Sequence, residues 1–151
     1  MDSVEAANTL MLMSEGCRIF SKVLTVSDAR RELSRLLIPS DYARNGILAF
    51  CSKLQQEEFS EGFGCMLSVI DADVVYNGGS RNAVIQLLFQ RWGRHGPFVF
   101  TTGWADYVER KGLMYNDVVR FWWNSHHSQF FISCEKSNDH QAVEFLTSSL
   151  A

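Results

Sequence analysis

The stretch FTTGWADYVERKGLMYNDVVRFWWN, residues 100–124, contains a short amphipathic segment between two strand-like runs. Trp104, Tyr107 and Val108 have the i, i+3, i+4 spacing that places three apolar side chains on one face of a helix. This segment predicts a helix with Thr102 as its N-cap, because a threonine side chain can accept a hydrogen bond from a free N–H group at a helix start.

The same stretch predicts where the helix ends. Gly112 follows two basic residues, and a glycine in the left-handed conformation is a common helix stop. Asn116 tolerates a positive φ, so Asn116–Asp117 predicts a turn into the strand VVRFWW, residues 118–123. We expect Asp117 to stabilise this turn.

The rest of the chain has more strand-like than helix-like patterns. Strands are expected where apolar and polar residues alternate, or where apolar runs lie between turn signals such as NGGSRN. These expected strands cover residues 17–24, 64–76 (as one or two strands), 83–92, 98–102, 118–123 and 128–136. Short helices are expected at 3–14, capped by Ser3, and at 41–56, capped by Ser40. About seven strands and two or three short helices predict a mainly β fold, an antiparallel barrel or a sandwich.

Length and composition are those of one globular domain. The chain has 151 residues, of which 46% are hydrophobic and 21% charged, and no apolar run approaches the roughly 20 residues of a membrane span. The N-terminus is acidic and has no basic segment before an apolar run, so we expect no secretory signal and an intracellular protein. Cys17, Cys51, Cys65 and Cys134 lack the usual zinc-ligand spacing, and we expect reduced, mostly buried thiols.

Charge is distributed unevenly along the sequence. The formal net charge is −3, which by itself argues mildly against binding to nucleic acid. However, residues 18–35 carry five basic and two acidic side chains, and residues 81–94 carry three basic and no acidic ones. A local basic stripe matters more than net charge for attracting a polyanion, so both segments are candidates for a DNA-binding surface.

Three motifs, in order along the chain, resemble the plant B3 DNA-binding domain. The motif in the opening stretch comprises Gly103–Trp104, Tyr107–Val108, Lys111, Leu113, Asn116–Asp117, Val118–Val119 and Phe121. An upstream motif comprises Phe20, Lys22, Leu24, Thr25, Ser27 and Asp28, followed by Arg35, Leu36, Ile38 and Pro39. Between them, Leu87 and Trp92 match a third motif, in which Ile85 replaces the family's first tryptophan. The resemblance covers about residues 17–136, and we expect Trp104 and Phe121 to be core residues.

The resemblance implies an open, seven-stranded β pseudobarrel with two short helices. Domains of this family grip the major groove of DNA between two arms, which correspond here to about Lys22–Arg35, the N-arm, and Gln90–His95, the C-arm. Both arms overlap the basic segments. We expect residues 1–16 to form a loose N-terminal arm or short helix, residues 17–136 the B3-like domain, and residues 137–151 a tail.

The family resemblance also implies a non-enzymatic regulator of plant transcription that acts in the nucleus on double-stranded DNA, without a cofactor or metal ion. The candidate DNA-binding residues are Lys22, Thr25, Ser27, Arg30, Arg31, Ser34, Arg35, Gln90, Arg91, Trp92, Arg94 and His95. Lysine and arginine can pair with phosphate, and arginine also with guanine. Hydroxyl groups can contact phosphate oxygens or base edges.

Simpler interpretations of these residues remain open. The N-arm arginines could lie in a solvated loop with one ion pair to Asp28 or Glu32, and Lys22 could lie on the exposed face of a strand. Ser27–Asp28 could cap a turn or a helix. Trp92 could be a core or hinge residue rather than a contact with DNA sugars and phosphates.

Two other functions compete with DNA binding. Ser34 stands where the family has an asparagine, a residue that pairs well with adenine, so the chain could be a protein-interaction or dimerisation module on the same fold. Its Met-rich segment at residues 10–13 would then pack against a partner or a second copy. A nuclease is the third possibility, but Asp71 and Asp73 have no flanking Glu-x-Lys or His. The histidines at 126–127 would point to opposite faces of a strand.

Overall fold

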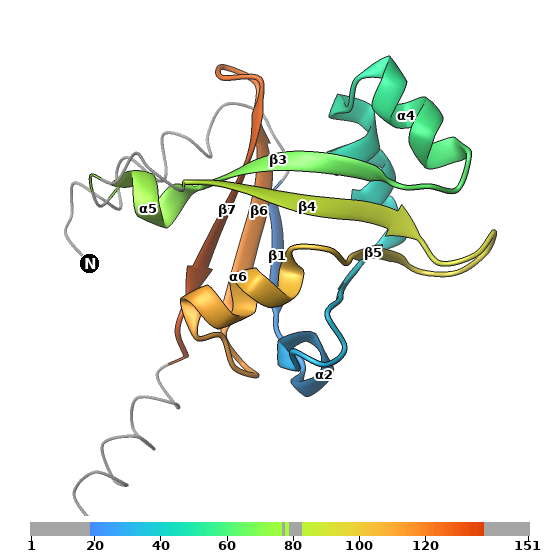
Figure 1. The fold of residues 1–151 in the computed structure, drawn as a ribbon. Coiled ribbons are helices and arrows are strands. Elements are labelled where there is room, and N and C mark those ends of the chain that lie inside the picture. Colours follow the sequence, from blue (N-terminus) through green and yellow to red (C-terminus); the bar gives the residue numbers. More distant parts are fainter. Residues whose placement is uncertain (1–18, 77, 79–82, 138–151) are drawn as a thin grey trace, which may run out of the picture.

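The computed structural model describes residues 19–76, 78 and 83–137, which form a seven-stranded sheet curled into an open barrel (Figure 1). The strands are β1 (Ile19–Val23), β2 (Leu36–Ile38), β3 (Cys65–Asp71), β4 (Val84–Arg91), β5 (Phe98–Phe100), β6 (Val118–Asn124) and β7 (Gln129–Glu135). Their order in the sheet is β1-β6-β7-β3-β4-β5-β2. The β3–β7 pair is parallel, and the other five pairs of neighbours in this order are antiparallel. The expected mainly β barrel is confirmed.

The alternation of residues along the strands fills the inside of the barrel. In β3, Leu67 and Val69 are fully buried, whereas Met66 before Leu67 and Ser68 after it are exposed, because successive side chains point to opposite faces. Aromatic rings from several strands meet in the core. The Phe121 ring, for example, lies 5.1 Å from that of Phe100 and 5.2 Å from that of Phe130.

The opening stretch folds as predicted in all but one detail. Helix α6 (Trp104–Lys111) ends at Gly112 in the left-handed conformation, and Asn116 has a φ of 72°. The N-cap residue, however, is Gly103 and not Thr102. The φ of Gly103 is 93°, and a Cβ at this position would lie 2.0 Å from the Gln86 carbonyl oxygen. The close approach of the helix start to β4 therefore selects glycine.

The predicted helix over residues 41–56 is wrong in its extent. The structure has helix α3 (Ser40–Tyr42), a π-helical turn (Ala43–Ile47) and a 3-10 turn (Leu48–Phe50), and a separate helix, α4 (Lys53–Ser60), follows. Ser40 lies inside α3 and does not cap it. A new helix starts at α4 because the Ser52 side chain accepts from the Gln55 N–H while the Gln55 side chain accepts from the Ser52 N–H.

The prediction of strand over residues 64–76 is also wrong at its end. Strand β3 stops at Asp71, and Ala72–Tyr76 form helix α5. The Asp71 carboxylate accepts hydrogen bonds from the backbone N–H groups of Asp73 (3.1 Å) and Val74 (3.4 Å), which favours a helical turn over a continued strand. The helix predicted at residues 3–14 lies outside the described residues, as does the predicted tail at 137–151 apart from residue 137.

The barrel is open between its two edge strands, β1 and β2. The Lys22 side chain from β1 bridges this opening, because its Nζ donates to the Leu37 carbonyl on β2 (3.0 Å). Tyr42 adds a second link, since its hydroxyl donates to the Phe121 carbonyl on β6 (3.0 Å). Side-chain hydrogen bonds therefore link parts of the barrel that are not joined by strand pairing.

Candidate nucleic-acid interface

The N-arm begins with a single helical turn, α2 (Val26–Ala29), whose N-cap is Thr25. The Thr25 hydroxyl accepts from the Asp28 backbone N–H (3.1 Å), and the Asp28 carboxylate accepts from the Thr25 backbone N–H (3.0 Å). This reciprocal arrangement is a capping box. Thr25 is exposed and Ser27 half-buried, and their hydroxyl oxygens lie 3.1 Å apart. The N-cap is therefore Thr25, and Asp28 completes the cap.

A buried ion cluster lies beneath this turn. The fully buried Asp28 carboxylate lies 3.1 Å from Lys22 Nζ and 3.1 Å from Arg35 Nη1. The side chains of Lys22 and Arg35 are only 21% and 14% exposed. Arg35 therefore forms the local ion pair with Asp28 that was one of the simpler interpretations of the N-arm arginines. Lys22 lies neither on an exposed strand face nor free at the surface.

The opening stretch of the sequence holds the N-arm from the other side. Trp104 Nε1–H donates to the Asp28 carbonyl (2.8 Å), across 76 positions of sequence. The Leu24 N–H donates to the Asp117 carbonyl (2.8 Å), and the Asn116 N–H donates to the Leu24 carbonyl (2.9 Å). Hydrogen bonds to Trp104, Asn116 and Asp117 therefore hold the start of the N-arm in place. The spacing of residues in the sequence did not predict these contacts.

Asp117 stabilises its turn, as expected. Its fully buried carboxylate accepts from the backbone N–H groups of Met114 and Ser137 (both 2.8 Å) and from Lys136 Nζ (3.2 Å). Burial alone would raise the pKa of Asp117, but these hydrogen bonds and the Lys136 cation hold the pKa below its usual value. The ionised carboxylate is part of the framework behind the N-arm.

The outer part of the N-arm carries two exposed arginines. Arg31 Nη2 lies 3.1 Å from Glu109 Oε2 on α6, but both side chains stay more than half exposed (65% and 56%). Arg30 is exposed and forms no ion pair within the described part of the chain. Ser34, half-buried with a φ of 45°, turns the chain into β2. Exposed N-arm charge therefore comes from Arg30 and, in part, from Arg31.

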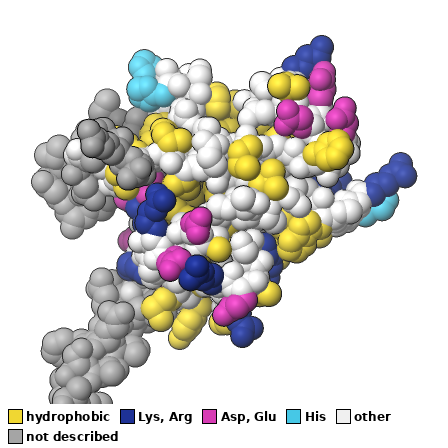
Figure 2. Space-filling model, viewed as in Figure 1, with side chains coloured by type: hydrophobic (Ala, Val, Ile, Leu, Met, Phe, Trp, Pro, Cys, Tyr) yellow, Lys and Arg dark blue, Asp and Glu magenta, His cyan; other side chains and the backbone are white. Residues whose placement is uncertain are grey.

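The C-arm is the hairpin between β4 and β5. The Trp92 N–H donates to the Pro97 carbonyl (2.9 Å) and closes the hairpin. Trp92 is 42% exposed, so it is not a core residue. Arg94 and His95 are exposed at the tip, as expected, and neither forms an ion pair with another described residue. Figure 2 shows basic and histidine side chains projecting from the molecule at this tip.

The first two C-arm residues are held against the hairpin. Arg91 Nε donates to the Gly96 carbonyl (2.9 Å), and its guanidinium lies 4.7 Å from the centre of the Phe98 ring. The side-chain amide oxygen of Gln90, Oε1, accepts from the Thr101 hydroxyl (3.1 Å). Both side chains are half-buried and shape the hairpin.

The pairing of β2 with β5 sets the distance between the arms. Leu36 lies opposite Phe100 and Ile38 opposite Phe98. The N-arm enters this pair at Leu36 and the C-arm at Phe98, so the arms lie at opposite ends of three residue pairs. At about 3.3 Å per residue the pair spans roughly 10 Å, and in Figure 1 the α2 turn and the β4–β5 hairpin flank β5.

The carboxylates considered for a nuclease belong to a structural ion pair. Lys111 Nζ lies 2.6 Å from the fully buried Asp71 carboxylate and 3.8 Å from that of Asp73. Burial raises the pKa of Asp73. Burial and the negative charge of Asp73 raise the pKa of the Cys134 thiol to about 11. Within the described ranges no cluster of three or more potential metal ligands occurs, and no helix is long and apolar enough to span a bilayer. Cys51, Cys65 and Cys134 are free thiols, buried or half-buried as expected.

An open seven-stranded barrel with a few short helices is the architecture of B3-type pseudobarrel domains. A family profile described as the C-terminal domain of the B3 domain-containing protein At5g26805 matches residues 19–134. The chain belongs to the B3 domain family.

Individual relatives are plant proteins. The chain is 33% identical over 106 residues to the AP2/ERF and B3 domain-containing transcription factor At1g51120 of Arabidopsis thaliana, covering 70% of this chain and 28% of the relative. It is 26% identical over 122 residues to the B3 domain-containing protein Os02g0764100 of Oryza sativa subsp. japonica, covering 80% of this chain and 56% of the relative. These relatives are described as a transcription factor and a B3 domain protein. It spans about a quarter to just over half of their lengths.

Two solved structures share the fold. The Arabidopsis FUS3–DNA complex has a TM-score of 0.58 at 20% identity and covers 80% of this chain and all of that chain. The Arabidopsis thaliana LEC2–DNA complex has a TM-score of 0.58 at 17% identity and covers 81% of this chain and 96% of that chain. At these identities the likeness concerns the fold, which agrees with the prediction made from the three motifs.

Proposed function

We propose that the chain is a double-stranded DNA-binding domain of a plant transcription regulator and grips the major groove with its N-arm and C-arm. The observation that carries this proposal is that each arm has an exposed arginine, Arg30 or Arg94, which forms no ion pair with another described residue. The strand pair between the arms spans roughly 10 Å, which is comparable to the width of the major groove, about 12 Å. The domain would act in the nucleus, where its target is located.

The candidate residues have different roles in this proposal. Arg30, Arg31, Arg94 and His95 contact phosphates or base edges, because their charged or polar ends are exposed. Thr25, Ser27 and Ser34 offer hydroxyls to the backbone, and Trp92 lies against sugars. Lys22 and Arg35 hold the N-arm in shape through Asp28, and Gln90 and Arg91 hold the C-arm. The DNA in the FUS3 and LEC2 complexes supports a nucleic-acid partner for this fold.

A salt titration tests the proposal. A duplex enriched from random oligonucleotides is titrated with the full chain between about 50 and 200 mM salt, and log K is plotted against log salt concentration. We expect a steep negative slope for the wild type. The double variant Arg30→Ala/Arg94→Ala should bind more weakly and lose about two units of slope, because each phosphate contact contributes about one unit.

Lys53→Ala is the control, because Lys53 is an exposed cation on α4, outside both arms. It should leave the slope unchanged. Equal slopes for the wild type and the double variant would refute the assignment of the arms. Absence of any salt-dependent duplex binding would refute DNA binding and favour the protein-interaction module.

A further inference from the structure

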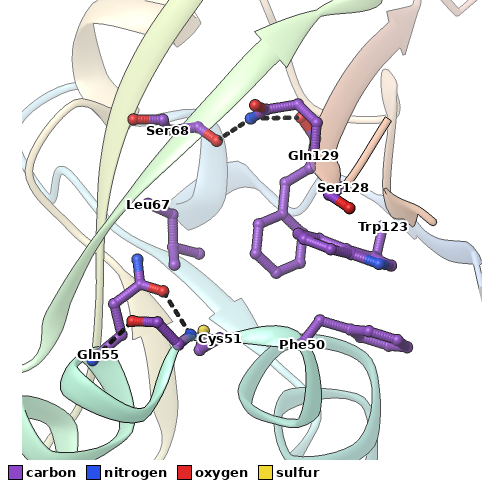
Figure 3. A pocket seen from close by; sticks show the side chains of 10 residues that line it. Phe50, Cys51, Gln55, Leu67, Ser68, Trp123, Ser128 and Gln129 are labelled. Carbon is purple, nitrogen blue, oxygen red and sulfur yellow. Dashed lines mark hydrogen bonds between the residues drawn. The ribbon is translucent and has the colours of Figure 1, made fainter. Parts of the chain in front are cut away.

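A hollow of about 360 Å³ lies between the start of α4, strand β3 and the β6–β7 hairpin (Figure 3). None of its lining residues belongs to either arm. The rings of Phe50 and Trp123 stack at one side, with centroids 5.4 Å apart. Side-chain amides of Gln55 and Gln129 lie at its edge, and each donates to a backbone carbonyl of β3. The hollow thus combines an aromatic wall with a polar edge.

Large apolar side chains are exposed on α4, in the loop after it and on β3. Leu54 on α4 is 64% exposed, Phe63 after α4 is 76% exposed, and Met66 on β3 is 42% exposed. The carbonyl of Met66 accepts from Gln55 Nε2 (3.0 Å), which places this residue beside the hollow. Grouped apolar side chains at a surface mark contact sites for other molecules more often than isolated ones do.

Three acidic residues accompany this apolar surface. Glu57, Glu58 and Glu61 lie on or directly after α4, and none of them forms an ion pair with a described residue. Figure 2 shows acidic and apolar side chains side by side over α4, at the upper right.

We propose that this surface, formed by the hollow, Leu54, Phe63, Met66 and the three glutamates of α4, docks a lysine- or arginine-rich amphipathic segment of a partner protein. An apolar side chain of the segment enters the hollow beside Phe50 and Trp123, and its cations pair with Glu57, Glu58 and Glu61. The negative charge repels a second DNA duplex, so the partner is a peptide and not nucleic acid. The exposed apolar side chains require a partner that is apolar on one face.

The docking surface and the two arms share no residue. The inference therefore does not depend on DNA binding. Phe59 packs α4 against the core rings of Phe89 (5.0 Å) and Phe98 (5.9 Å), and Leu54, Glu57 and Glu61 remain exposed at the surface.

Selection from a phage-displayed library of random dodecapeptides on the full chain tests this proposal. We expect the enriched peptides to combine several lysines or arginines with at least one large apolar residue. A synthetic enriched peptide, followed by fluorescence anisotropy, should bind at least tenfold more weakly to the triple variant Glu57→Gln/Glu58→Gln/Glu61→Gln. The matched control Glu32→Gln/Asp106→Asn/Glu135→Gln removes three other surface carboxylates and should change affinity less than twofold.

A second variant separates docking from folding. Leu54→Ser changes an exposed side chain and should weaken the peptide severalfold while the urea midpoint stays unchanged. No enrichment of basic peptides, or equal affinity of the triple variant and the wild type, would overturn the proposal. It would also be overturned if sedimentation velocity showed that the triple variant disrupts self-association of the wild type, because the occupant would then be a second copy.

Discussion

The N-arm and the C-arm carry similar positive charge, but they are built differently. The base of the N-arm is a buried ion cluster in which Asp28 holds Lys22 and Arg35, with Trp104 bonded to the same turn. The C-arm is a hairpin closed mainly by backbone contacts, and its tip cations have no carboxylate partner in the described structure. The comparison shows that one arm uses part of its charge to maintain its own shape, whereas the other exposes its charge.

This difference changes the meaning of a charge count. Both arms belong to segments with the same excess of three positive charges. In the N-arm, two of the cations are largely buried against one carboxylate. Substitutions at the base of the N-arm should therefore affect stability first, and substitutions at the C-arm tip should affect binding first.

The largest effect is expected from Asp28→Ala. This change leaves the Lys22 and Arg35 charges without their partner in a mostly buried site and removes the α2 cap, so we expect a loss of about 3 kcal/mol in the free energy of unfolding. Urea unfolding followed by tryptophan fluorescence measures it. Glu32→Ala, an exposed carboxylate on the same arm, should change stability by less than about 0.5 kcal/mol. A loss below about 1 kcal/mol for Asp28→Ala would mean that the cluster does not hold the N-arm.

Gly96→Ala should distort the C-arm. A Cβ at Gly96 would lie 1.5 Å from the Trp92 carbonyl oxygen, so the hairpin backbone must move. We expect a stability loss of up to about 2 kcal/mol and at least a tenfold loss of duplex affinity, measured by fluorescence anisotropy. Gly93→Asn is the matched control, because a Cβ at Gly93 meets open space and asparagine tolerates its φ of 75°. If Gly96→Ala and Gly93→Asn bound DNA equally well, the C-arm geometry would not matter for binding.

The pH dependence of stability should reveal Asp117 behind the N-arm. Because the folded pKa of Asp117 lies below its unfolded value, its ionised form stabilises the fold above the unfolded pKa, and this contribution is lost as the pH falls through the folded pKa. The stability difference between the wild type and Asp117→Asn should therefore be large at about pH 6 and shrink toward about pH 3. Urea unfolding at several pH values measures this difference. A difference that stays constant with pH would contradict an ionised role for Asp117.

The smallest stability effect is expected from Arg31→Ala. The ion pair between Arg31 and Glu109 is more than half exposed at both ends, and such pairs contribute about 0.5 kcal/mol or less. Duplex affinity should nevertheless fall several-fold, because Arg31 retains an exposed charge on the N-arm. A stability loss above about 1 kcal/mol with unchanged affinity would move Arg31 from the binding surface to the framework. Chemical denaturation and anisotropy on the same samples separate the two outcomes.

Local patterns predicted α6 and the turn after it well. Trp104, Gly112 and Asn116 each have a conformational or packing preference that acts within one or two helical turns. The helix expected over residues 41–56 failed because Ser52 and Gln55 cap a new helix and a π-helical turn precedes it. A period of apolar residues alone does not distinguish one helix from two short ones with an irregular turn between them.

The candidate site was predictable only in part. Exposure of Arg94 and His95 followed from their polarity in a tight turn, whereas the burial of Lys22 and Arg35 did not follow from their sequence positions. Lys22 and Arg35 are buried against Asp28 because the fold brings β1, β2 and α6 together around this carboxylate. The docking surface beside α4 was not predicted, because exposed Leu54, Phe63 and Met66 have no distinguishing pattern in the sequence.

The sequence by itself determined the mainly β fold, its family and the two basic segments, because strand alternation, turn residues and motif order are properties of neighbouring positions. Only the tertiary structure decided which of those charges remain exposed, where the two arms lie relative to each other, and which apolar side chains stay at the surface. The physical reason is that burial and ion pairing depend on contacts between strands distant in sequence, and a charge is neutralised by whichever carboxylate the fold brings within reach.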